Sequence, residues 1–261
     1  MRNTEEISRK NGIIVSRIGD YVMKKFENTA DRREIRNYQI LRELGVPTIQ
    51  IIDATDDTLL MEDITKSETW RLGRDEDMSN PKIARAIAVW YKKLHEAGIN
   101  FPALHELYDE TDFITLANMD FIAEKTNTIG NPVWDLIRER FDDIRRMIEV
   151  LPRTLTYNDF YWSNLVVAKD GTSAMMFDFH LLGKGYVYSD VRNVTYSLRD
   201  EAINAFLDEY GTTNFDEKTA DAIIEPLFGL YVACERTQFP EWAVPSLNKI
   251  KSEEYYELLR R

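Results

Sequence analysis

The sequence predicts an α+β fold with two lobes, a small β-rich N-terminal lobe over residues 1–65 and a larger helical lobe over residues 66–261. Short β-favouring runs separated by turns dominate the first part, whereas apolar residues recur at helical spacing through most of the second. One predicted β-hairpin, over residues 155–179, interrupts the helices. A chain of 261 residues is long enough for such a pair of lobes, and a cleft between two lobes is a common place for a ligand.

Turn residues indicate where the strands and the helix of the small lobe end. Gly19 and Asp20 separate two β-favouring runs, which predicts a hairpin. Gly45 and Pro47 follow an amphipathic stretch and end a helix. An Asp-rich turn separates two further runs. The expected elements are strands over 12–18, 21–26, 49–53 and 58–62, and a helix over 31–44.

The character of the chain changes after Asp63. A helix is expected from Ser79, with Pro81 in its first turn and Gly98 past its end. Its apolar stripe recurs at helical spacing and needs a core to face: Ile83, Ile87, Trp90, Tyr91 and Leu94. Further helices are expected over about 115–150 and most of 199–261.

Composition excludes several classes of protein. The formal net charge of −12 argues against a nucleic-acid backbone as the main partner and suits a cationic ligand, although acidity also simply favours solubility. One cysteine, Cys234, rules out an internal disulfide framework, and the three histidines are not paired at helical spacing for a metal. The N-terminus lacks an apolar signal-peptide core, and no apolar run reaches the length of a membrane span. A cytoplasmic protein without a membrane partner is therefore expected.

The polar stretch TYNDFYWSN, residues 156–164, stands directly before the predicted hairpin. Asn164 precedes the outgoing strand and Asp178 follows the returning one, so the hairpin brings an amide oxygen and a carboxylate together. Asp159 lies one loop away. Such oxygen ligands suit Mg²⁺, which typically takes one or two carboxylates and completes its shell with phosphates and water. The alternative is that these residues only cap turns.

A lysine and a glutamate in the small lobe favour the metal hypothesis. Strand alternation in YVMKKF places Lys24 on one face with Val22 and Phe26, where its ammonium could reach a phosphate or simply extend to solvent. Glu34 heads a helical stripe with Tyr38, within the first turn of its helix. This arrangement predicts that Glu34 pairs with Lys24.

The order of these parts resembles the protein-kinase-like fold, and within it the aminoglycoside phosphotransferase and choline kinase family. That family typically shows His-Gly-Asp-x4-Asn and then Ile-Asp-Phe or Ile-Asp-Trp, which TYNDFYWSN and MMFDF resemble. Asp190 in YVYSDVRN resembles the family's structural Asp, and WYKKLHEAG, residues 90–98, resembles the helix that ends in Leu-His. The resemblance covers roughly residues 12–200.

The resemblance implies an ATP- or GTP-dependent kinase that phosphorylates a hydroxyl of a small molecule. Asp159 would be the catalytic base, and Asn164 and Asp178 would hold Mg²⁺. Lys24, paired with Glu34, would contact the α and β phosphates. The nucleotide's adenine would meet Val22 and the hinge, whose residues are Met61, Glu62, Asp63 and Ile64.

Three departures from the family pattern leave an alternative open. Tyr157 and Asn158 replace His-Gly, His180 stands where protein kinases have Gly, and only RKNGI, residues 9–13, is placed to cover the phosphates. A catalytically silent kinase-like protein that binds a nucleotide or metabolite would also fit these departures. A hydrolase with paired carboxylates explains neither the lysine strand nor the hinge.

The acceptor is expected to be a small cationic molecule, such as an aminoglycoside, choline or a related amino alcohol or amino sugar. Aromatic residues Tyr161 and Trp162 flank the loop and could add cation–π contacts. Acidic residues are plentiful in the helical lobe, although most such charges form a solvated face: Glu106, Asp109, Glu110, Asp112, Glu235 and Glu241. The sequence does not predict an oligomeric state.

Overall fold

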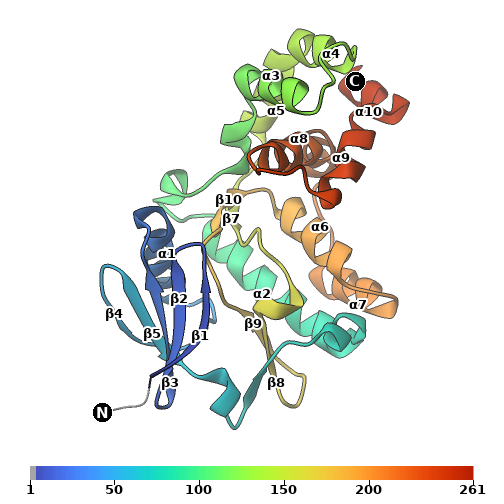
Figure 1. Cartoon of the computed structure of the whole chain (residues 1–261). Helices are drawn as coiled ribbons and strands as arrows, with labels where there is room; N and C mark the ends of the chain where they lie inside the picture. Colours follow the sequence, from blue (N-terminus) through green and yellow to red (C-terminus); the bar gives the residue numbers. More distant parts are fainter. Residues whose placement is uncertain (1–3, 261) are drawn as a thin grey trace. The chain divides into compact units, whose positions relative to one another are not determined.

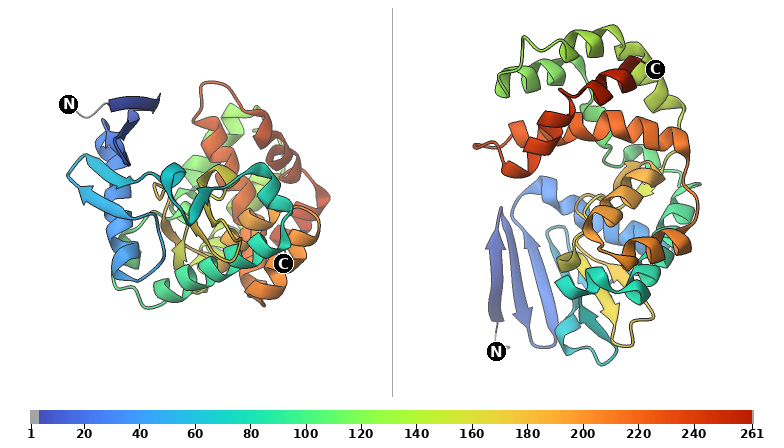
Figure 2. Two further views of the ribbon diagram at one scale, coloured as in Figure 1. Left: turned by 90° about the horizontal axis from the view of Figure 1, so that it is seen from below. Right: turned by 90° about the vertical axis from the view of Figure 1, so that its right-hand side faces the viewer.

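The computed structural model describes residues 4–260, which form two compact units (Figures 1 and 2). The first unit comprises residues up to 107 together with 154–183 and 190–212, and the second comprises 108–153, 184–189 and the residues from 213 onward. The first unit therefore contains the β-rich region and also the predicted polar loop and hairpin. The predicted division into lobes at residue 65 stays a prediction.

The strands are β1 (Thr4–Lys10), β2 (Ile13–Ile18), β3 (Tyr21–Phe26), β4 (Ile51–Ala54), β5 (Thr58–Glu62), β6 (Trp70–Leu72), β7 (Thr154–Thr156), β8 (Leu165–Ala168), β9 (Ala174–Met176) and β10 (Gly183–Gly185). The helices are α1 (Arg33–Glu43), α2 (Pro81–Gly98), α3 (Leu116–Lys125), α4 (Val133–Glu139), α5 (Phe141–Val150), α6 (Val187–Ser197), α7 (Glu201–Tyr210), α8 (Phe215–Cys234), α9 (Val244–Lys249) and α10 (Glu253–Arg260). Short 3-10 turns, such as Thr29–Arg32 and Ile64–Lys66, join several of them.

Five antiparallel strands form the large sheet of the first unit, in the order β1-β2-β3-β5-β4. The predicted hairpin of β2 and β3 is present, with Ile18 opposite Tyr21. Helix α1 lies beside this sheet in both views (Figures 1 and 2). Strand β1 was not predicted, because its residues are exposed throughout and TEEISRK shows no apolar alternation.

A second sheet, of strands β6, β8 and β9, carries the predicted hairpin. Leu165 pairs with Met176 and Val166 with Met175, and all four side chains are buried. Helix α2 contacts strand β9 and also packs against α7. This sheet holds the two ends of the hairpin in register, immediately beside the polar loop.

Helix α2 has the predicted start and a different end. Its N-cap Asn80 accepts a hydrogen bond from the Lys82 amide, and Pro81 is its first residue. Gly98 was expected past the helix but is its last residue. A Cβ on Gly98 would lie 2.2 Å from the Leu155 nitrogen, so glycine serves here to let strand β7 approach the helix rather than to end it.

The second unit is helical and has its own core. Helices α3, α4, α5, α8 and α10 bury a cluster around Ile122, Trp134, Leu227 and Leu230.

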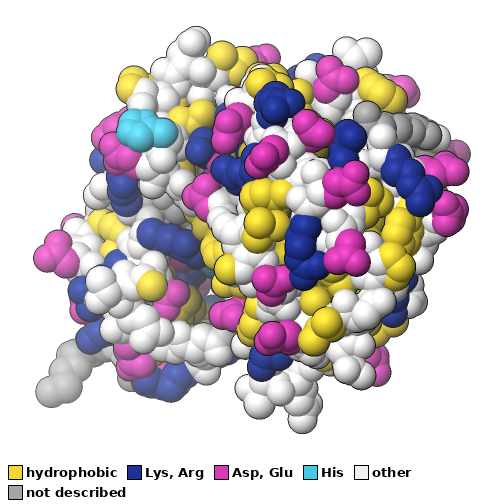
Figure 3. All heavy atoms as spheres, turned by 90° about the horizontal axis from the view of Figure 1, so that it is seen from above, with side chains coloured by type: hydrophobic (Ala, Val, Ile, Leu, Met, Phe, Trp, Pro, Cys, Tyr) yellow, Lys and Arg dark blue, Asp and Glu magenta, His cyan; other side chains and the backbone are white. Residues whose placement is uncertain are grey.

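Among the described residues, no helix is long and apolar enough to cross a membrane. Basic and acidic side chains alternate over the face shown in Figure 3, so the net negative charge is not gathered into one field on that face.

Candidate active site

The hairpin brings the predicted loop residues together. The Phe177 amide donates to the Asn164 carbonyl at 3.1 Å, which places Asp178 beside Asn164. The Asn164 side-chain amide donates to Asp159 Oδ2 at 2.9 Å and to the Asp159 carbonyl at 3.1 Å. Asp159, Asn164 and Asp178 therefore line one site, and the amide nitrogen of Asn164 faces Asp159.

Asp190 fixes the backbone that precedes Asp159. Its fully buried carboxylate accepts hydrogen bonds from the Tyr157 amide at 2.8 Å and the Asn158 amide at 3.0 Å. His95 Nε2 lies 3.1 Å from the same carboxylate. Asn158 adopts a positive φ of 65°, a conformation that asparagine tolerates better than most residues. Asn158 therefore provides the left-handed backbone conformation at the position where the family pattern has glycine.

The ring of Tyr157 packs among apolar side chains, and its hydroxyl group is hydrogen-bonded. Its side chain is fully buried, and its ring meets Trp90 and Phe179 edge-on. Its hydroxyl donates to the Phe177 carbonyl, just before Asp178. The tyrosine thus ties the loop to the segment that carries Asp178.

The predicted pair of Lys24 and Glu34 is present and extends to the loop. Lys24 Nζ lies 2.6 Å from Glu34 Oε2 and 3.0 Å from Asp178 Oδ1. The side chain of Glu34 is fully buried on α1, while that of Lys24 is 10% exposed. The same helix makes two further contacts, since Asn37 donates to the Phe179 carbonyl at 2.7 Å and the Asp178 amide donates to the Tyr38 hydroxyl at 3.3 Å.

The charges of the site shift each other's pKa values. Burial raises the pKa of Asp178, but a hydrogen bond from His180 and the charge of Lys24 outweigh it and hold that pKa well below its usual range. Burial raises the pKa of Asp159, opposed by His180 and reinforced by Asp178. Burial also raises the pKa of Glu34 to about 7, against the charge of Lys24. Asp178 is therefore the carboxylate most firmly held in its charged form.

A cavity of about 460 Å³ opens beside this cluster. Its walls include Val22 and Met61, which face each other on β3 and β5, and its polar end includes Lys24, Asp178 and His180. Lys10, Asn11 and Ile13 of the RKNGI turn also line it. Of the predicted hinge residues, Met61 lines the cavity, whereas Glu62, Asp63 and Ile64 do not.

The side chains of the hinge are engaged elsewhere. Glu62 accepts a hydrogen bond from the Gln50 amide. Asp63 accepts from Thr65 and, at 2.7 Å, from Arg17 Nε. Ile64 is buried. Any contact that these three residues make with a nucleotide would have to come from their backbone.

The donor set fits Mg²⁺. Asn164 directs its amide nitrogen to Asp159, which leaves its side-chain carbonyl oxygen available to a cation, and Asp178 adds a carboxylate with a strongly lowered pKa. Among residues 4–260 no group of three or more His, Cys, Asp and Glu side chains is arranged to hold a metal. A site with so few protein ligands suits an ion that shares its shell with phosphates and water.

A sequence model of the phosphotransferase enzyme family matches residues 13–223. The chain belongs to this family. The matched range contains the residues of the site from Lys24 to Asp190. The predicted enzyme class, a small-molecule kinase, is thereby confirmed.

Solved structures share the fold of this phosphotransferase at low identity. A choline/ethanolamine kinase family protein from Mesorhizobium loti has a TM-score of 0.64 at 16% identity over 99% of this chain and 91% of that one. The ternary complex of streptomycin, ATP and APH(2″)-IIa has a TM-score of 0.66 at 14% identity over 96% and 91%. The GDP complex of an aminoglycoside 2′-phosphotransferase-IIIa mutant has a TM-score of 0.62 at 12% identity over 98% and 92%. These neighbours confirm the protein-kinase-like fold, while no curated protein matches the sequence.

The sequence did not reveal the parts played by Asn37, Tyr38 and His180. His180 Nδ1 lies 3.0 Å from Asp178 Oδ1 and 4.0 Å from Asp159 Oδ2. A histidine two residues after an Asp is a weak signal by itself, because only folding brings Asp159 to it. The polar contacts of α1 were equally hidden, since they join residues about 140 positions apart.

The acids expected to attract a cationic acceptor are partly neutralised. Asp109 is 3% exposed and lies between Lys184, at 3.0 Å, and Arg153, at 3.5 Å. Glu106 pairs with Arg36. Tyr161 and Trp162, two and three residues after Asp159, are 61% and 42% exposed. The aromatic side chains are thus better placed to meet a ligand than these two acids.

Proposed function

We propose that this phosphotransferase moves the γ-phosphate of ATP, or of GTP, to a hydroxyl group of a small cationic molecule. The observation that carries the proposal is the cluster of Lys24, Asp159, Asn164 and Asp178, of which Lys24 and Asp178 line the cavity. A nucleotide is supported by the ATP and GDP complexes among the structural neighbours. Val22 and Met61 supply an apolar wall for the base, and the backbone of Met61–Ile64 would supply its polar contacts.

In the proposed reaction, some residues would position the substrates and others would neutralise the charge of the phosphates. Lys24, held by Glu34, would bind the α and β phosphates. Asn164 and Asp178 would hold Mg²⁺, which neutralises charge on the phosphates when it is bound. Asp159 would accept the hydrogen bond of the acceptor hydroxyl, orient it toward the γ-phosphate and take its proton. Little covalent chemistry is required of the protein, because positioning and electrostatics lower most of the barrier.

A cationic acceptor is supported by the aromatic residues that closely follow Asp159 in the sequence. The exposed rings of Tyr161 and Trp162 offer π faces to a cation, and Asp159 itself adds a negative charge. A quaternary amine and an amino sugar share this chemistry. A screen of both classes for ADP release would identify the acceptor.

The first experiment is thermal unfolding with Mg·ATP, Mg·GTP, each nucleotide without metal, and no ligand. A ligand at about 100 times its dissociation constant adds roughly 2.7 kcal/mol of stability, which raises the melting temperature measurably. We expect a metal-dependent rise in wild type and its loss in Asp178→Ala. If wild type shows no rise with any nucleotide at millimolar concentration, the nucleotide-dependent activity is rejected in favour of a protein that acts on another donor or binds another metabolite.

A further inference from the structure

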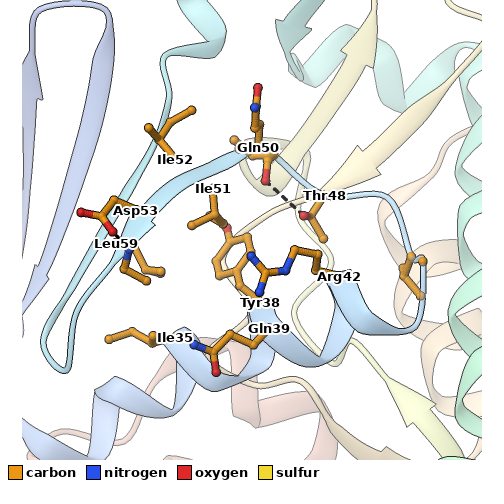
Figure 4. Close-up of a pocket in the computed structure, with 14 residues that line it drawn as sticks. Ile35, Tyr38, Gln39, Arg42, Thr48, Gln50, Ile51, Ile52, Asp53 and Leu59 are labelled. Atoms are coloured by element: carbon orange, nitrogen blue, oxygen red, sulfur yellow. Dashed lines mark hydrogen bonds between the residues drawn. The ribbon is translucent and has the colours of Figure 1, made fainter.

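A second and larger cavity lies between helix α1 and strand β4 (Figure 4). Its volume is about 670 Å³, and it is bounded by α1, the segment after that helix, and the whole of strand β4. None of the residues assigned a catalytic, nucleotide or metal role lines it. Strand β4 is an edge strand of the sheet, so no further strand from residues 4–260 pairs with its outer edge.

The lining of this cavity is amphiphilic. Its apolar wall is formed by Ile35 on α1 and by Ile51 and Leu59 on the sheet, and Tyr38 and Arg42 extend from α1 toward Ile51 (Figure 4). Within residues 4–260 the Arg42 guanidinium forms no ion pair, although most arginines of this chain do. A free guanidinium above an apolar wall complements a molecule with an anionic head and an apolar body.

The other charged residue of the lining does not cancel Arg42. Asp53 lies toward the far end of β4 from Arg42 in the close-up (Figure 4). Its carboxylate already accepts a hydrogen bond from the Ala54 amide at 2.9 Å. The anionic group of a ligand would therefore be expected at the Arg42 end.

Helix α1 connects this cavity to the active site. Tyr38 is 2% exposed and lines both cavities, and its hydroxyl accepts a hydrogen bond from the Asp178 amide. One residue position away, Asn37 binds the Phe179 carbonyl, and Glu34 on the same helix holds Lys24. A ligand that packs against Tyr38 between α1 and β4 would help to hold the helix where it meets Lys24 and Asp178.

We propose that the cavity between α1 and β4 is a regulatory site for a small amphiphilic anion, a carboxylate or phosphate attached to an apolar body. Its anionic group binds Arg42, and its apolar body packs on Ile35, Tyr38 and Ile51. Occupancy stabilises the position of α1 in which Glu34 pairs with Lys24. The regulatory effect rests on the proposed nucleotide site, whereas the binding itself does not.

Binding is tested with 8-anilinonaphthalene-1-sulfonate, a fluorescent dye that joins a sulfonate to aromatic rings, on the full chain without nucleotide. We expect saturable binding to wild type and an affinity about tenfold lower in Arg42→Gln, the loss typical of one charged hydrogen bond. The matched control is Arg36→Gln, on the same helix, because Arg36 is paired with Glu106 and does not line the cavity. Equal dye affinity in wild type and Arg42→Gln overturns the site.

A variant whose larger side chain fills the cavity distinguishes dye bound there from dye bound elsewhere on the protein. Gln39 is exposed on α1 and lines the cavity, so Gln39→Trp should abolish the Arg42-dependent binding, whereas Glu43→Trp, on the same helix but outside the lining, should not. Free decanoate should displace the dye from wild type. Displacement only by vesicles of an anionic phospholipid would overturn the assignment to a free small molecule.

The regulatory effect is tested by reciprocity. Saturating dye should raise the affinity for Mg·ATP about fivefold or more, and saturating Mg·ATP should raise the dye affinity by the same factor. Displacement of the dye by Mg·ATP would show that both share the active-site cavity and would overturn the proposal. If Mg·ATP does not bind at all, the proposed function fails while the dye results still decide the second site.

Discussion

Asn158 shows how one residue satisfies both a backbone and a side-chain constraint. Its φ of 65° is strained for most side chains, and its side-chain amide donates to Thr156 Oγ1 and to the Leu181 carbonyl, both at 3.0 Å. Asn158→Gly and Asn158→Ala remove the same two hydrogen bonds. At most positions alanine is the more stable of the two, but here its Cβ should make it less stable than glycine by about 1 kcal/mol.

Urea unfolding of the two Asn158 variants measures this difference directly. The glycine variant should also keep the higher turnover, because the loop that carries Asp159 retains its backbone conformation. An alanine variant as stable as the glycine variant would mean that φ at this position relaxes without cost.

Asp159 is the residue on which the proposed chemistry depends most. Asp159→Asn keeps the size of the side chain and a carbonyl that can still accept from Asn164 Nδ2, but it cannot take a proton. We expect turnover to fall by roughly 10²–10⁴, with little change in the affinity for Mg·ATP. Steady-state ADP release and nucleotide titration measure the two quantities separately. Unchanged turnover would remove Asp159 from its assigned role.

At the scale of elements, Asp63 links the end of strand β5 to the sheet. Its buried carboxylate caps the 3-10 turn at Thr65 and pairs with Arg17 of β2. Burial raises the pKa of Asp63, but the hydrogen bonds from Thr65 and Arg17 outweigh it, so the folded-state pKa lies below the ordinary 3.8. A lowered pKa stabilises the fold above pH 3.8, and this stability is lost as the pH falls through the folded-state value.

Asp63→Asn tests this contribution. The variant should be less stable than wild type by about 1–3 kcal/mol at pH 7, the cost of losing charged hydrogen bonds at a buried site. The difference should shrink as the pH falls below 3.8, because wild type then loses the charge that the variant never had. Urea unfolding of both proteins between pH 7 and pH 3 provides the measurement. A difference that is independent of pH would show that the charge is not what stabilises the turn.

The elements best predicted from the sequence are those with local signals. The hairpin of β2 and β3 follows from Gly19-Asp20. The pairing of β8 with β9 follows from two apolar runs on either side of the turn at Lys169, Asp170 and Gly171. Strands β1 and β6 escaped prediction, since β1 is exposed along its length and β6 has three residues. Both owe their conformation to a neighbouring strand and not to their own apolar pattern.

The proximity of the proposed site residues was predictable for a similar reason. Asn164 and Asp178 flank one hairpin and Asp159 lies one loop before it, so local topology is enough to bring them together. Strand alternation selected Lys24 over Lys25. Residues that act through distant contacts were not predictable. The Asp178 amide meets Tyr38, which is 140 positions away, and only the packed structure shows it.

At the scale of the whole molecule, the two compact units differ in what they contain. The proposed nucleotide and metal residues all belong to the first unit, while the second has a separate helical core around Trp134 and Leu227. The fold is shared with neighbours that are only 12–16% identical, which shows that many sequences can build it.

The proposed nucleotide and metal residues all belong to the first unit. A ligand that binds only to these residues should therefore stabilise the two units unequally.

Hydrogen exchange with and without Mg·ATP tests this expectation. At a nucleotide concentration of about 100 times the dissociation constant, amides of β3, β5 and β8 that exchange through opening of the first unit should slow by about 100-fold. Amides of α3 and α8 should slow much less, because opening of the second unit leaves the nucleotide bound. Equal slowing in both units would mean that they open together as one cooperative unit. Asp178→Ala serves as the control, since it should lose the slowing in the first unit without changing exchange in the second.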